Sequence, residues 1–209
     1  MKHLRMLAVA SVAIAALFAV GTGTSSATVF CKSPIAPCSS KYPKGTKIHA
    51  ILQSGTELVK RSDDKTKVID TCNMSTLELT TTNEGSSTES IGASLFSWTL
   101  SNCHWPNALE ILGSMEFHYD SKTGTTVVTG KSTRITELVN FVLDCHYSFG
   151  TGTTLGTLTQ PASGSSDTIF HMNVTINRLA GSNEACAAST VWQATYTVTS
   201  PVPLYVTGS

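Results

Sequence analysis

The chain has 209 residues, of which only 13% are charged, and its 14 basic and 14 acidic side chains leave no net charge. This composition excludes the broad basic surface that attracts nucleic acid or an anionic membrane. Threonine instead supplies 29 of the last 182 residues, and its β-branched side chain fits the pleated surface of a sheet. The sequence therefore predicts strands whose solvent faces carry hydroxyl groups rather than charges.

Residues 1–27 have the pattern of a secretory signal peptide. Lys2 and Arg5 form a basic start, residues 6–20 form an almost wholly apolar run, and small and polar residues follow. A helix of that length rises only about 22 Å, which is short of the ~30 Å hydrocarbon core of a bilayer. We expect cleavage after Ala27, export of the rest of the chain, and no stable membrane insertion afterwards.

Alternation of apolar and polar residues dominates the exported part. It is clearest in residues 191–199, where Trp192, Ala194, Tyr196 and Val198 share one face of an extended chain. Polar or glycine-rich turns separate such stretches. In chain order, the stretches expected as strands are residues 46–52, 56–60, 67–72, 75–80, 96–100, 115–119, 125–129, 133–149, 170–177, 191–199 and 204–206.

Many short strands separated by turns predict a single all-β domain over residues 28–209. The expected architecture is an antiparallel β-sandwich stabilised by disulfides, with a jelly roll or a closed barrel as alternatives. Residues 81–90 contain no large apolar side chain and are expected as a surface loop. A turn of helix would fit residues 108–112.

All of the cysteines lie in the part expected to be exported, at positions 31, 38, 72, 103, 145 and 186. An even number in an exported chain predicts three disulfides, although many pairings are open. Sequence order favours the pairs that close short loops, which are Cys31–Cys38, Cys72–Cys103 and Cys145–Cys186. Cysteines paired in this way serve neither as nucleophiles nor as zinc ligands.

The sequence predicts no catalytic residue, no cofactor and no metal site. His118 and Asp120 share one strand face, which is a spacing that a metal could use, but two ligands without a third are ordinary surface residues. No Gly-x-Ser-x-Gly motif occurs. The carboxylates of Glu110, Glu116 and Asp144 could still meet in space, so a hydrolase stays open as an alternative.

The three tryptophans have different surroundings in the sequence. Trp98 and Trp192 are in phase with apolar neighbours, which predicts that both lie in the core. Trp105 precedes Pro106 in a turn and is the tryptophan expected to be exposed. An exposed tryptophan could stack on a sugar ring, so Trp105 is the candidate binding residue.

Several short motifs carry a resemblance to other proteins. They are Cys31-x6-Cys38, Gly45-Thr46-x-Ile48-x-Ala50, Thr71-Cys72, Gly152-Thr153, Gly156-Thr157-Leu158-Thr159, and the ending from Trp192 through Pro201 and Pro203 to Val206. In these motifs the chain resembles a group of secreted, cysteine-bearing, uncharacterised bacterial all-β proteins. The resemblance implies export and a β fold, and it carries no catalytic residue to this chain.

These observations predict a secreted, non-enzymatic protein of the cell surface or the extracellular space. Its expected partner is an envelope polymer or a surface protein, and not nucleic acid. One alternative is a carbohydrate- or polymer-binding module that uses Trp105 and the threonine-rich strand faces. The other is a secreted hydrolase, which requires a cleft with convergent carboxylates or histidines.

Overall fold

The computed structural model shows an all-β chain. It describes residues 28–53, 57–61, 68–104, 107–139 and 143–208. The strands are β1 (Val29–Cys31), β2 (Lys47–Leu52), β3 (Glu57–Arg61), β4 (Val68–Thr81), β5 (Ile91–Cys103), β6 (Asn107–Asp120), β7 (Thr125–Val139), β8 (Leu143–Phe149), β9 (Thr154–Thr159), β10 (Thr168–Arg178), β11 (Ser189–Ser200) and β12 (Tyr205–Thr207). The all-β class predicted from alternation is confirmed.

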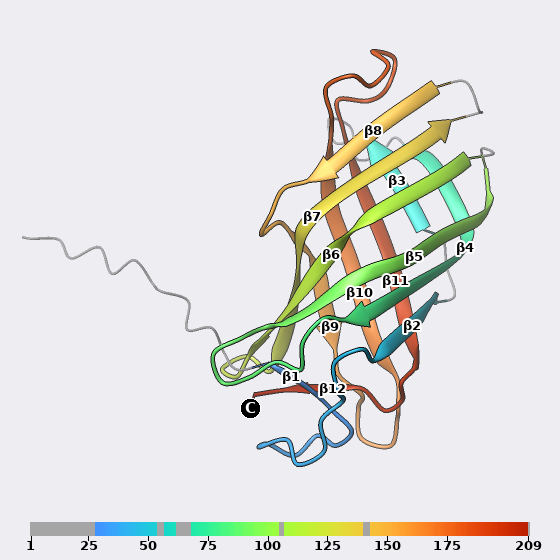
Figure 1. Ribbon diagram of the computed structural model, residues 1–209. Helices are drawn as coiled ribbons and strands as arrows, with labels where there is room; N and C mark the ends of the chain where they lie inside the picture. The colour runs from blue at the N-terminus through green and yellow to red at the C-terminus, as the bar shows by residue number, and fades with distance from the viewer. Residues whose placement is uncertain (1–27, 54–56, 62–67, 105–106, 140–142, 209) are drawn as a thin grey trace, which may run out of the picture.

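Eight of these strands form a closed antiparallel ring (Figure 1). Strands β4, β5, β6 and β7 pair in chain order, β7 pairs with β9, and β9, β10 and β11 complete the series. The ring closes through β2, which pairs with β11 on one side and with β4 on the other. Leu52 lies opposite Tyr196, and Ile51 lies opposite Thr76. Closure gives these strands neighbours on both sides, which an open sheet denies to its edge strands.

Two positions in the ring are each filled by two shorter strands. Both β2 and β3 lie between β11 and β4, and both run antiparallel to β11, so β3 continues the course of β2. In the same way, β8 and β9 both lie between β7 and β10. Each of these two positions in the barrel is therefore occupied by two shorter strands in succession instead of one long strand.

The closed barrel was the alternative offered by the sequence, and the expected two packed sheets of a sandwich are not what the structure shows. Alternation tells which residues face inward, but the pairing of β11 with β2 joins residues about 150 positions apart. Local patterns do not encode that register. The expected helical turn at residues 108–112 is also wrong, because these residues form part of β6 and pair with β7.

Inward-facing apolar side chains fill the barrel. The buried core includes Phe117, Phe170, Trp192 and Tyr196, which come from three different strands. An apolar cavity of about 20 Å³ lies among inward-facing side chains that include Met115, Phe117 and Leu204. Ligand pockets of drug size measure about 300–1,000 Å³, so this cavity is a packing gap. The interior acts as a core that holds the wall in shape.

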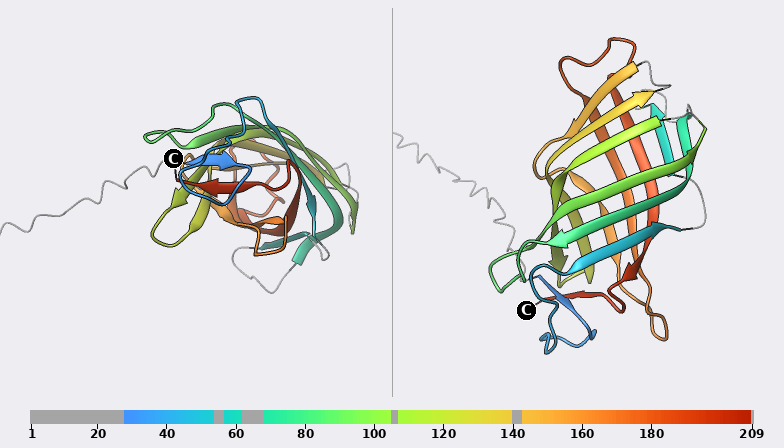
Figure 2. Two further views of the ribbon diagram at one scale, coloured as in Figure 1. Left: turned by 90° about the horizontal axis from the view of Figure 1, so that it is seen from below. Right: turned by 45° about the vertical axis from the view of Figure 1, so that its right-hand side comes forward.

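A two-stranded ribbon crosses one end of the barrel, as the view from below in Figure 2 shows. It pairs β1 with β12, with Phe30 opposite Val206. At most 1% of the surface is exposed in three of its residues, Phe30, Leu204 and Val206, which join the core. The Phe30 ring lies edge-on to the Phe117 ring, with ring centroids 5.1 Å apart. The ribbon therefore seals this end with apolar side chains.

Three disulfides link the cysteines in the order that short loops favour: Cys31–Cys38, Cys72–Cys103 and Cys145–Cys186. The third joins β8 to the segment that leads into β11. The described residues include no helix of the length and apolar character needed to cross a bilayer. The expected signal peptide, residues 1–27, and the candidate binding residue Trp105 both lie outside the described residues.

Candidate binding surface

A ring of hydrogen bonds fixes the aromatic side chains behind β11. The Trp98 indole Nε1–H donates to the Tyr196 hydroxyl at 2.9 Å and to Ser75 Oγ at 3.3 Å. Ser75 Oγ and the Tyr196 hydroxyl are 2.9 Å apart, and Trp98 stacks on Trp192 with ring centroids separated by 4.6 Å. Because buried polar groups are costly unless they are paired, this ring sets one arrangement of the side chains. Trp98 and Trp192 are both buried, as the sequence predicted.

Strands β9, β10 and β11 lie side by side (Figure 1), and their outer faces carry mostly neutral polar side chains. In these three strands only Arg178, at the end of β10, carries a permanent charge. We define the uncharged wall as the outward-facing residues Thr157, His171, Asn173, Gln193, Thr195 and Thr197.

Cross-strand hydrogen bonds organise the uncharged wall. The Gln193 amide donates to Asn173 Oδ1 at 3.4 Å, and His171 Nδ1 lies 3.4 Å from Thr195 Oγ1. His171 and Asn173 are exposed, and their partners on β11 are half-buried. The wall thus offers hydroxyl, amide and imidazole groups in a regular register, with donors and acceptors that can reach a ligand lying across the strands.

The outer faces of β6, β7 and β8 have a different chemistry. We define the charged wall as Glu116, His118, Asp120, Lys131, Arg134, Asp144 and His146. Lys131 Nζ lies 2.9 Å from Glu116 Oε1, and His146 Nε2 lies 3.1 Å from Asp144 Oδ2. The hydrogen bond from Lys131 to Glu116, and then the attraction between their charges, raises the pKa of Lys131 above its ordinary value. Glu116 with Lys131, and Asp144 with His146, are therefore engaged in local pairs.

Of the carboxylates considered for a hydrolase, Glu116 and Asp144 do not converge on one described cleft, and the side chain of Glu110 lies outside the described part of the structure. Glu116 on β6 and Asp144 on β8 lie on either side of β7 and have separate partners. His146 joins Asp144 to the Thr136 hydroxyl, with Nδ1 at 3.3 Å from Thr136 Oγ1. This order of groups is that of a hydrolytic triad, but none of the three residues lines the interior cavity described above.

His118 and Asp120, which share a strand face, have separate hydrogen-bond partners. The Asp120 carboxylate accepts hydrogen bonds from the backbone N–H of Lys122 and the hydroxyl of Thr123, which lower its pKa below the ordinary value. His118 Nε2 instead lies 3.0 Å from Thr129 Oγ1. Asp120 thus organises the turn after β6, and His118 bonds across to β7.

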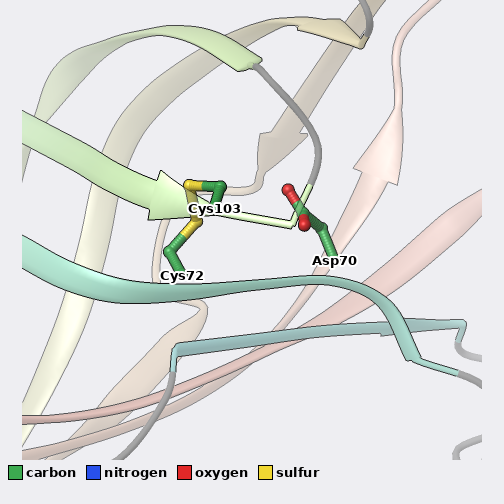
Figure 3. Close-up of side chains that lie close together, drawn as sticks. All are labelled: Asp70, Cys72 and Cys103. Atoms are coloured by element: carbon green, nitrogen blue, oxygen red, sulfur yellow. A yellow bond between two sulfur atoms is a disulfide. The ribbon is translucent and has the colours of Figure 1, made fainter.

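One further group of metal-binding residue types is found among the described residues: Asp70, Cys72 and Cys103 (Figure 3). The two cysteines are joined as a disulfide, with sulfurs 2.03 Å apart. A disulfide lacks the thiolate that would bind a metal ion. Asp70 accepts a hydrogen bond from the backbone N–H of Thr71 at 2.8 Å, so its carboxylate has a structural role in β4.

A groove opens on the outer surface beside the uncharged wall. It has a volume of about 260 Å³ and lies where β2 ends, against β4 and β5. Its lining residues are Ile51, Leu52, Asn73, Met74, Ser75, Thr76, Thr99 and Ser101. Simple alternation does not predict it, because Asn73 and Met74 are consecutive and both exposed, between the buried Cys72 and Ser75. The pairing of β4 with β5 has no register shift between Cys72 and Glu78, so Met74 shares a strand face with Thr76.

No protein-family model, curated protein or solved structure matches this chain. Its function is therefore argued from the chemistry of its walls and of the groove.

Proposed function

We propose that this protein is a secreted, non-enzymatic binding protein of the extracellular space or cell surface, and that its uncharged wall recognises a neutral, hydroxyl-rich polymer such as a polysaccharide. The observation that carries this proposal is the register of His171, Asn173, Gln193 and Thr195 across β10 and β11. Neutral polar groups in fixed positions match a ligand that offers many hydroxyls and no charge.

Four features support this assignment. Apolar side chains of the described residues pack the interior around a cavity of only about 20 Å³, which favours recognition at the outer surface. The disulfides suit an oxidising compartment outside the cytoplasm. The outer face of β9, β10 and β11 also lacks the charge that would attract an anionic polymer. The signal-peptide pattern of residues 1–27 is consistent with export.

The test is retention of the purified, disulfide-bonded protein on insoluble cellulose, chitin, starch and yeast mannan. Thr195→Glu places a carboxylate near the middle of the uncharged wall, where it must be desolvated against the polymer. Leu112→Glu is the matched control, because Leu112 is 60% exposed on β6 and lies opposite Arg134. We expect retention of the wild type and of Leu112→Glu, and loss of retention by Thr195→Glu.

Salt provides an independent readout for the same experiment. Recognition by neutral groups predicts retention that changes little between about 0.05 and 1 M NaCl, whereas charge attraction would be screened over that range. Failure of the wild type to bind any of the four polymers, or equal retention of Thr195→Glu, would overturn the proposal.

A further inference from the structure

We infer that the groove at the junction of β2, β4 and β5 holds a single ring of the neutral sugar polymer. This inference rests on the proposed function and names the place on the barrel where one unit of the polymer is bound. A sugar ring combines apolar C–H faces with hydroxyl groups at its rim. The groove likewise combines apolar side chains with hydroxyl and amide groups, and it lies beside the uncharged wall.

The apolar part of the groove consists of Ile51, Leu52 and Met74. Met74 is 61% exposed and Ile51 is 40% exposed, which leaves apolar surface in water at a cost that a covering ligand would remove. The thioether of methionine is polarizable and adapts its shape to the surface that it contacts. These side chains can cover the C–H face of a ring.

The polar part of the groove carries no charged group. Asn73, Thr76, Thr99 and Ser101 supply one amide and three hydroxyls, and the hydroxyls of Thr76 and Thr99 bond to each other across β4 and β5. Amides and hydroxyls both donate and accept hydrogen bonds, as the hydroxyls of a sugar do. An ionic ligand would find no opposite charge among the residues that line this groove.

The groove also has a rigid wall. Ser75 lines it although only 5% of Ser75 is exposed, and the Ser75 hydroxyl belongs to the ring that includes Trp98 and Tyr196. A site supported by locked side chains loses little conformational freedom when a ligand binds. The Trp98 indole donates a hydrogen bond to the Ser75 hydroxyl, so only Ser75 separates Trp98 from the sugar unit in the groove.

Register connects the groove to the uncharged wall. Ile51 lies between Thr197 of β11 and Thr76 of β4, and Thr76 lies opposite Thr99 of β5. A polymer that crosses the strands from β10 over β11 would therefore place its next part at the groove. The uncharged wall would contact an extended part of the polymer, and the groove would hold one of its sugar rings.

The methionines allow a direct test. Residues 28–209 contain three methionines, of which Met74 is exposed, whereas Met115 and Met172 are buried at 2% and 4%. The full exported chain would be labelled with 13C in its methionine methyl groups. It would then be titrated with hexasaccharides of β-1,4-glucose, β-1,4-N-acetylglucosamine, α-1,4-glucose and α-1,6-mannose. We expect one of them to shift the Met74 methyl signal and to leave the signals of Met115 and Met172 unchanged.

A variant pair gives the corresponding affinities by calorimetry. Met74→Lys should weaken binding of that hexasaccharide by about tenfold or more, which corresponds to the loss of one buried apolar contact and the desolvation of a charge. Leu112→Lys, at an exposed position of β6 opposite Arg134 of the charged wall, should leave the affinity unchanged. Near-ultraviolet circular dichroism of both variants would confirm that the aromatic core is intact.

The outcomes separate the two proposals. If the wild type is retained on a polymer and Thr195→Glu is not, while the Met74 methyl does not shift and Met74→Lys binds normally, the groove assignment is wrong and the proposed function stands. If the wild type is retained on no polymer and no hexasaccharide shifts the Met74 signal, both proposals fail.

Discussion

The uncharged wall and the charged wall are built on the same alternation, and they differ in what holds each of them together. Behind the uncharged wall lies the hydrogen-bonded ring of Ser75, Trp98 and Tyr196, and a glycine brings two backbones into close approach. The charged wall carries exposed ion pairs such as Glu116 with Lys131. The fold needs only the inward faces to be apolar, so it does not by itself account for the difference between the two outward faces. We expect perturbation of the first wall to have the larger effect on stability.

The largest effect is expected for Gly156→Ala in β9. A Cβ atom on Gly156 would lie 1.9 Å from the carbonyl oxygen of His171, a backbone atom of β10 that cannot swing away. Overpacking of this kind costs about 3 kcal/mol, which should lower the Tm by about 6–12 °C in a domain of this size. Differential scanning calorimetry would measure the change.

The matched control is Gly150→Ala, because a Cβ there would meet only Thr153 Oγ1 at 3.7 Å, an ordinary contact. The Tm of Gly150→Ala should differ from that of the wild type by no more than surface substitutions usually cause. Equal destabilisation by both variants would contradict the close approach of β9 and β10.

The second effect is expected for Tyr196→Phe, which removes one hydroxyl from the buried ring. The Trp98 indole N–H then keeps only the longer bond to Ser75. Leaving buried polar groups under-satisfied costs about 2 kcal/mol, and urea unfolding would measure it. Tyr205→Phe is the control, because Tyr205 is only half-buried on β12. A Tyr196→Phe variant as stable as the wild type would show that the ring contributes no stability.

A smaller effect is expected for Glu116→Gln on the charged wall. The partner Lys131 is 61% exposed, and exposed ion pairs contribute little to stability because water and salt screen them. The difference between wild type and variant in free energy of unfolding should shrink when salt is raised from about 0.05 to 1 M. A loss of stability as large as that of Tyr196→Phe, or one that is insensitive to salt, would contradict the view that this wall is held by weak surface pairs.

The smallest effect is expected from Asp120 at acidic pH. Its folded pKa is lowered by hydrogen bonds from Lys122 and Thr123, so its contribution is present above the ordinary aspartate pKa and is lost as the pH falls through the lowered value. Urea unfolding between about pH 5 and 2 should show a shallower decline for Asp120→Asn than for the wild type. Asp167→Asn, an exposed loop position, serves as the control. An unchanged acid decline would mean that these hydrogen bonds do not favour the folded state.

The sequence predicted much of the local structure. The alternation in residues 191–199 correctly identified Trp192, Ala194, Tyr196 and Val198 as inward-facing. The order of cysteines favoured the pairs that the structure contains. Both results follow from short-range constraints, since alternation is fixed by strand geometry and short loops close most readily.

The candidate site was less predictable. The sequence pointed to Trp105, which lies outside the described residues. The groove combines residues from β2, β4 and β5 and depends on the exposed pair Asn73 and Met74. The sequence did place Met74 between two expected strands, which hints that it is exposed. The residues of β2 and β5 that join it in the groove could not be found from the chain around Met74.

By itself, the sequence determined the class of the fold, the inward and outward faces of its main strands, and a surface rich in hydroxyls, because each depends on residue type and period along the chain. Tertiary structure decided that the sheet closes, that His171 meets Thr195, and that Ile51 lies beside Thr76. These results depend on the register between strands far apart in the chain. That register is selected by packing of the whole core and not by any local pattern.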